Sequence, residues 1–136
     1  MSNKDTIASI YEAFLRGDIP FILNRLADDV EWGYAPDNSS QKADLPWMKL
    51  YKGRETVNEF FNFVETMGIY RFDILSLLEG GNEVAARLNI ACKYFDDEII
   101  HFWTFNDEGK VTLYQQFTDT AKHIGGFENA QKSTAA

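Results

Sequence analysis

Two residues in the last third of the chain, His101 and Asp119, carry side chains suited to proton transfer. An imidazole titrates near neutral pH, so His101 can polarise or protonate a substrate carbonyl. The carboxyl group of Asp119 can act as a general acid or base if an apolar pocket raises its pKa toward neutrality. Asp119 and His101 are therefore the candidate catalytic residues, and Gln115 is a candidate to orient a substrate carbonyl or hydroxyl.

Each candidate also has a purely structural interpretation. Asp119 can cap the end of its strand or bond the backbone amides of residues 120–126. His101 can be a satisfied pocket histidine that is hydrogen-bonded to Gln115. The expected strand pairing separates His101 from Asp119 by roughly 13 Å. This distance excludes a direct dyad but lets the two residues hold a ligand from two ends.

Aromatic residues make up 15% of the 136 residues, with 11 Phe, 6 Tyr and 3 Trp. So many rings either fill the core or line a cavity for a flat hydrophobic ligand. Both interpretations stay open for each ring. The candidate substrate-binding residues, with Gln115, are Tyr11, Phe14, Trp32, Tyr34, Trp47, Trp103 and Phe117.

Helical spacing of apolar residues predicts helices in the first half of the chain. The first begins after a Ser2 cap and ends at Gly17, with Ile7, Ile10, Tyr11, Phe14 and Leu15 on one face. A shorter helix follows Asp18, and a third, with Val57, Phe60, Phe61 and Val64 on one stripe, closes at Gly68. Residues 30–34 alternate as a short strand, and residues 35–53 form a long loop that we expect to act as a lid.

The second half of the chain alternates with a period of two, which predicts an antiparallel meander over residues 70–79, 83–95, 98–106 and 110–120. Helices followed by such a meander indicate an α+β domain with helices on one face of the sheet. Pairing Phe105 with Val111 places His101, Gln115 and Asp119 on the inner face.

The same register places Ile100, Phe102 and Tyr114 on the outer face of the sheet. A half-apolar face with no helices left to cover it predicts a homodimer through that surface.

The composition excludes several classes of function. A net charge of −8 argues against nucleic acid or an anionic membrane as a partner. Cys92 is the single cysteine and is expected to be a buried apolar residue. The acidic run 96–98 is expected to be solvated, and no His–carboxylate cluster has metal-ligand spacing, so no metal or cofactor is expected. With no apolar span and a polar N-terminus, we expect a cytoplasmic protein of one domain, residues 1–136.

Several motifs give the chain a family resemblance over most of its length. The segment 101–127 resembles the closing hairpin of nuclear transport factor 2-like, SnoaL-like proteins, which include polyketide cyclases and relatives of ketosteroid isomerase. The main match lies in Trp103-x-Phe105, Gly109-Lys110-Val111 and Phe117-Thr118-Asp119-Thr120; support comes from Tyr11-x-x-Phe14-x-x-Gly17-Asp18, the segment 26–32 and Gly53-Arg54.

The resemblance implies a cone-shaped, cystatin-like fold in which a strongly curved antiparallel sheet wraps around three helices and encloses a pocket. It also implies dimerisation through the outer face of the sheet. In the cyclase members a strand aspartate is the acid/base, and Asp119 resembles it in position. Two other reactions of the fold fit poorly. Arg87 is followed by Asn89 where the epoxide hydrolases have an aspartate, and the paired histidines of the dehydratases are not matched, because His123 lies in the tail.

The sequence therefore predicts a protein that binds a small hydrophobic or ring-containing molecule and that can be a cofactor-free isomerase or cyclase using Asp119. The alternative is a ligand-binding or dimerisation module of the same fold without catalysis.

Overall fold

The computed structural model of the protein describes residues 1–33 and 38–135, with side chains up to residue 132. Its elements follow in the order α1 (Asn3–Leu15), α2 (Ile19–Leu23), β1 (Leu26–Gly33), α3 (Ser39–Lys42), η1 (Pro46–Met48), β2 (Tyr51–Lys52), α4 (Arg54–Val64), η2 (Glu65–Met67), β3 (Arg71–Gly80), β4 (Glu83–Ala91), β5 (Asp96–Phe105), β6 (Val111–Phe117) and α5 (Thr120–Ala135).

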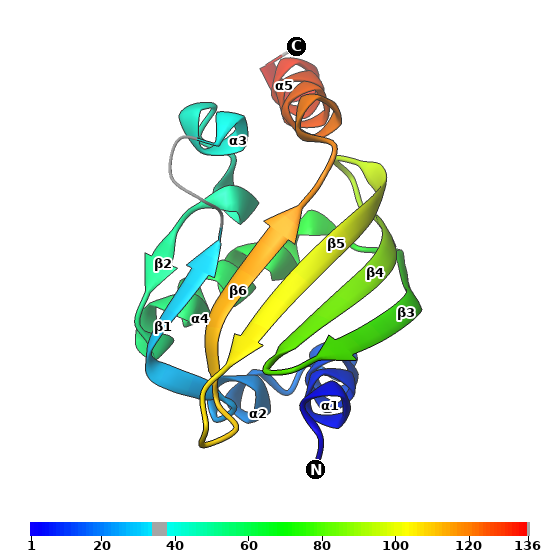
Figure 1. The fold of residues 1–136 in the computed structure, drawn as a ribbon. Helices are drawn as coiled ribbons and strands as arrows, with labels where there is room; N and C mark the ends of the chain where they lie inside the picture. Colours follow the sequence, from blue (N-terminus) through cyan, green and yellow to red (C-terminus); the bar gives the residue numbers. More distant parts are fainter. Residues whose placement is uncertain (34–37, 136) are drawn as a thin grey trace.

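The strands form one curved, open six-stranded sheet in the order β2-β1-β6-β5-β4-β3. Neighbouring strands are antiparallel except β1 and β6, which run parallel. Helices α1, α2 and α4 lie together on one side of the sheet (Figure 1). The α+β architecture with a curved sheet and three covering helices is therefore confirmed.

The helices that cover the sheet use the caps and the apolar stripe that the sequence predicts. The Ser2 hydroxyl accepts a hydrogen bond from the Asp5 amide, and the Asp18 carboxylate accepts one from the Phe21 amide. On α4 the apolar stripe is buried against the sheet, and it consists of Val57, Phe60, Phe61 and Val64. Gly68 ends η2 in the left-handed conformation, with φ of 64°.

The predicted loop 35–53 contains more structure than its composition suggested. In the part that is described it forms α3, η1 and β2, and Trp47 and Met48 of η1 are buried in the core. Tyr34, a predicted substrate-binding residue, lies outside the described residues.

A C-terminal helix, α5, was not predicted, because Gly125 and Gly126 interrupt a mostly polar segment and both disfavour a helix. The structure gives Gly126 a packing role. A Cβ atom at that position would overlap the carbonyl oxygen of Tyr94, so only glycine lets α5 approach the turn between β4 and β5 this closely.

The predicted register of the last hairpin was wrong beyond its first pair. Phe105 does pair with Val111, but Thr104 pairs with Leu113, so Thr112 is an extra residue on β6. One extra residue turns every later side chain to the opposite face. Gln115 and Phe117 therefore leave the inner face.

The residues that take their place on the inner face are Tyr114, which had been assigned to the outer face, and Gln116; both are buried. The faces of β5 are as predicted, with His101 buried on the inner face and Ile100 and Phe102 on the outer face.

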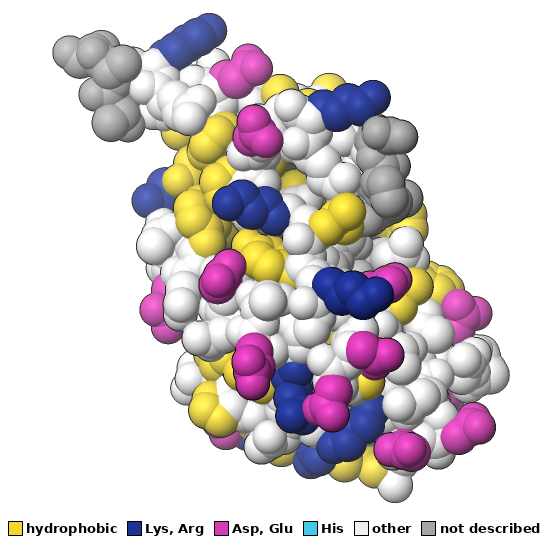
Figure 2. Space-filling model, turned by 90° about the vertical axis from the view of Figure 1, so that its left-hand side faces the viewer, with side chains coloured by type: hydrophobic (Ala, Val, Ile, Leu, Met, Phe, Trp, Pro, Cys, Tyr) yellow, Lys and Arg dark blue, Asp and Glu magenta, His cyan; other side chains and the backbone are white. Residues whose placement is uncertain are grey.

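Acidic and basic side chains are interspersed over the face seen in Figure 2, so the net charge of −8 is not gathered into one patch there. None of the helices in the described part of the chain is long and apolar enough to span a membrane.

Candidate ligand-binding site

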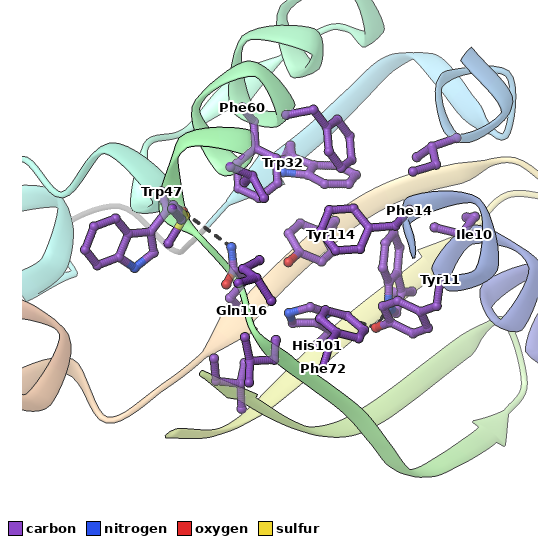
Figure 3. Close-up of a pocket in the computed structure, with 18 of the residues that line it drawn as sticks. Ile10, Tyr11, Phe14, Trp32, Trp47, Phe60, Phe72, His101, Tyr114 and Gln116 are labelled. Atoms are coloured by element: carbon purple, nitrogen blue, oxygen red, sulfur yellow. Dashed lines mark hydrogen bonds between the residues drawn. The ribbon is translucent and has the colours of Figure 1, made fainter. Parts of the chain in front are cut away.

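A cavity of about 70 Å³ lies between the sheet and the helices α1, α2 and α4 (Figure 3). Its walls are apolar and largely aromatic, and they come from every layer of the fold. The lining residues are Ile10, Tyr11, Phe14, Ile22, Trp32, Trp47, Phe60, Phe61, Val64, Met67, Ile69, Phe72, Ile90, Phe95, Ile99, His101, Trp103, Tyr114 and Gln116.

Most of the lining residues are buried, whereas Phe14, Ile69 and Phe72 are only partly buried. The rings of Phe14 and Phe72 contact each other across α1 and β3, with centroids 5.3 Å apart. These three side chains mark the side on which the cavity approaches solvent.

Three polar side chains form a hydrogen-bond relay in the cavity wall. The Trp103 indole N–H donates to the Tyr11 hydroxyl at 3.1 Å, and the Tyr11 hydroxyl lies 2.8 Å from Nδ1 of His101. The indole can only donate, and Nδ1 of His101 is the other hydrogen-bond partner of the Tyr11 hydroxyl among the described residues, so we assign the hydroxyl proton to the bond with Nδ1. Nδ1 is then the acceptor, and the proton of the neutral His101 imidazole resides on Nε2.

Burial sets the charge of this relay. It lowers the pKa of His101 to about 3 and raises the pKa of Tyr11 above its ordinary value. At neutral pH the relay is therefore uncharged, and His101 is a weak base.

Trp32 and Gln116 supply the other polar atoms of the wall. The Trp32 ring stacks on Tyr114 with centroids 4.0 Å apart, and its indole N–H is buried without a hydrogen-bond partner. The Gln116 side-chain amide donates to the Trp47 carbonyl at 3.4 Å, which leaves its Oε1 as an acceptor.

The structure brings six of the predicted site residues together in the lining: Tyr11, Phe14, Trp32, Trp47, His101 and Trp103. Gln115, Phe117 and Asp119 are not among the lining residues, and Phe117 is 50% exposed. Tyr114 and Gln116 were missed as cavity residues because the extra residue at Thr112 is set by tertiary packing and leaves no mark in the alternation of the sequence.

Asp119 lies exposed immediately before α5. Its carboxylate accepts a hydrogen bond from the Lys122 amide at 3.2 Å, which is the geometry of a helix N-cap. Asp119 thus binds a backbone amide that follows it, as in the structural interpretation that the sequence left open for this residue.

A second buried polar cluster adjoins the cavity at Trp47. The Trp47 indole N–H donates to Nδ1 of His123 at 2.9 Å, and Nε2 of His123 lies 3.0 Å from the Asp97 carboxylate. Asp97 was expected to be solvated, but it is 7% exposed and also accepts from the Asp119 amide and from the Lys122 ammonium. Burial lowers the pKa of His123, against the opposing effect of Asp97.

The described residues contain no cluster of three or more His, Cys, Asp or Glu able to hold a metal ion. Cys92 is buried, as expected, and burial raises the pKa of its thiol.

Comparison with known structures defines the class of fold. An NTF2-like protein from Burkholderia pseudomallei is 26% identical, covers 91% of this chain and 96% of its own, and superimposes with a TM-score of 0.73. TerC, which was co-crystallised with polyporic acid, is 25% identical over 93% of this chain and 98% of its own, with a TM-score of 0.73. IdmH from Streptomyces antibioticus, described as a proposed polyketide cyclase, is 17% identical over 94% and 99% of the two chains, with a TM-score of 0.70.

The model of the SnoaL-like domain family matches residues 7–114, which is most of the chain. The protein belongs to the SnoaL-like family, within the NTF2-like fold. Among curated proteins no match was found.

Proposed function

We propose that this SnoaL-like protein binds a small hydrophobic molecule in the cavity between its sheet and its helices. The observation that carries the proposal is a cavity with aromatic and aliphatic walls interrupted by only a few polar atoms, which is the usual composition of a small-molecule site. The co-crystallisation of the relative TerC with polyporic acid supports this class of function.

The volume of the cavity limits the ligand. An engineered protein cavity of about 150 Å³ accepts benzene, whereas this cavity measures about 70 Å³. A ligand of one ring therefore requires side chains of the wall to rotate. Phe14 and Phe72 are the natural candidates because they are only partly buried and contact each other.

Ligand binding has better support than acid/base catalysis in which Asp119 is the catalytic residue. The carboxylate of Asp119 is exposed and caps α5, and among the described residues that line the cavity none is an Asp or Glu. His101, the remaining candidate, is held neutral by burial and uses Nδ1 within the relay. We therefore expect Asp119→Asn to leave ligand affinity unchanged.

The proposal is tested by titrating the protein with small ring compounds, beginning with toluene and acetophenone, by calorimetry. A cavity-filling substitution, Ile90→Phe on β4, should weaken binding by at least about tenfold because the new ring occupies the ligand volume. The absence of binding by any neutral ring compound would contradict the proposed function.

Leu88→Phe is the matched control. Leu88 lies on the same strand and the same face as Ile90 and is fully buried, but it is not a lining residue. Both substitutions overpack the core, so only a loss of affinity confined to Ile90→Phe assigns binding to the cavity. An equal loss in both variants would count against that assignment.

A further inference from the structure

We propose that α5 is an acid-released latch: a neutral His123 holds this helix against the wall of the cavity, and a protonated His123 releases it. Release uncovers the end of the cavity that Trp47 and Phe95 form. The release itself is independent of the proposed function, whereas its effect on ligand entry rests on that function.

The helix α5 is held by one buried side chain. Among residues 120–132, the part of α5 whose side chains are described, only His123 is buried, with an exposed fraction of 0%. Ile124 and Phe127 are half-buried, and a cleft of about 280 Å³ lies between them and the segment 43–45. A helix with so few buried contacts undocks at a smaller cost in free energy than global unfolding. His123 is therefore the residue that decides whether α5 stays docked.

His123 contacts two residues of the cavity wall. The ring of Phe95, a lining residue, stacks on His123 with centroids 3.9 Å apart. Trp47, also a lining residue, donates to Nδ1 of His123 at 2.9 Å, and its ring contacts that of Phe127 with centroids 5.6 Å apart. Figure 3 shows Trp47 at the opposite end of the lining residues from Tyr11. Both aromatic walls at this end are thus backed by α5, and its departure would expose them to solvent.

The hydrogen bonds of His123 require a neutral imidazole. Because an indole N–H can only donate, Nδ1 of His123 accepts from Trp47, and the ring proton lies on Nε2, 3.0 Å from the Asp97 carboxylate. A second proton would occupy Nδ1 and point at the indole N–H. Two donors cannot bond to each other, so protonation breaks the contact between α5 and Trp47.

The surroundings of His123 determine the direction of the pH dependence. Burial is the largest influence and lowers the pKa of His123 from its ordinary value of 6.5. Asp97 on β5 and Asp119 just before α5 raise that pKa, Lys122 on α5 lowers it, and η1 and the turn before β5 contact His123 through uncharged rings. In released α5 the imidazole is hydrated and regains its ordinary pKa. Release therefore takes up a proton below pH 6.5, and acid favours it.

The test is hydrogen exchange followed by NMR from pH 8 to pH 5. Relative to intrinsic rates at each pH, the Trp47 indole N–H and the α5 amides should lose protection by up to about tenfold for each pH unit below 6.5, because release binds one proton. The Trp103 indole N–H, which is bonded to Tyr11, should remain more protected at every pH. Constant protection of Trp47 and α5 over this range would overturn the proposal.

His123→Gln and Lys122→Gln form a matched pair on the same helix. Glutamine does not titrate, so His123→Gln should abolish the pH dependence of exchange in α5. Lys122→Gln removes a docking contact, since the Lys122 ammonium lies 3.4 Å from the Asp97 carboxylate, but it leaves His123 in place. It should speed exchange at every pH and keep the slope. A wild-type slope in His123→Gln, or a lost slope in Lys122→Gln, would show that His123 is not the latch.

Ligand entry is tested with toluene, which has no titratable group. Its association rate, measured by stopped-flow tryptophan fluorescence, should increase below pH 6.5 in parallel with the release of α5, and should not depend on pH in His123→Gln. If α5 is released while the rate stays constant, α5 does not control entry and that part of the proposal is wrong. If toluene does not bind at any pH, the proposed function fails for this compound, while the exchange data still decide whether His123 is a latch.

Discussion

Burial of His101 makes the stability of the protein depend on pH. Its pKa is lowered from 6.5 to about 3 by desolvation, so the folded protein holds it neutral where the unfolded chain would protonate it. Between these two pH values the unfolded state binds the additional proton. The contribution of His101 to stability is therefore fully present above pH 6.5 and is lost as the pH falls toward 3.

We predict that the free energy of unfolding decreases by up to about 1.4 kcal/mol for each pH unit below 6.5 on account of His101. His101→Gln should flatten the dependence of unfolding free energy on pH, as measured by urea denaturation at pH 7 and pH 4.5. The imidazole resonances of His101 in the wild-type protein should not titrate over the same range. A midpoint near 6.5 for those resonances would contradict this prediction.

At the scale of elements, the Asp97–Trp47–His123 cluster joins three segments that are distant in sequence. It links β5, η1 and α5, and the Phe95 ring stacks on His123 with centroids 3.9 Å apart. Such a cluster compensates for the poor intrinsic helix propensity of α5, whose two adjacent glycines disfavour a helix. Asp97 is its central acceptor.

We predict that Asp97→Ala destabilises the protein by about 2–3 kcal/mol, because donors that the carboxylate now satisfies would be left buried and unpaired. Amide hydrogen exchange should become faster in α5 than in β4 and β5. Asp73→Ala removes an exposed carboxylate from the edge strand β3 and serves as the control, with an expected effect within about 0.5 kcal/mol. Equal effects of the two substitutions would show that Asp97 has no special role in docking α5.

The same elements show what local patterns encode and what they do not. Apolar spacing and caps predicted α1, α2 and α4, because these features lie within each segment. The extra residue at Thr112 and the helix α5 depend on contacts made elsewhere in the fold, so alternation and propensity could not reveal them. The candidate site follows the same division. Residues on α1, β1 and β5 were assigned to it correctly, and those on β6 beyond the bulge were placed on the wrong face.

For the whole molecule, the uncovered face of the sheet remains to be explained. With the extra residue at Thr112 taken into account, one row of cross-strand neighbours on this face contains Leu78, Ala85, Phe102 and Gln115. A neighbouring row contains Arg87, Ile100 and Phe117. Leu78 is 68% and Phe117 50% exposed. The covering helices α1, α2 and α4 all lie on the opposite side of the sheet (Figure 1). We propose that a second copy of the chain covers this face.

A carboxylate at the centre of this face would have to be buried in the dimer without a partner, which costs several kcal/mol. Phe102→Asp should therefore convert a wild-type dimer into a monomer at micromolar concentration, as measured by light scattering. Leu15→Asp is the control, since Leu15 is 61% exposed at the end of α1 on the helical side. A monomeric wild type, or a dimer that survives Phe102→Asp, would show that the interface lies elsewhere or does not form. Because the cavity opens on the helical side of the sheet, both wild type and Phe102→Asp should bind acetophenone with similar affinity.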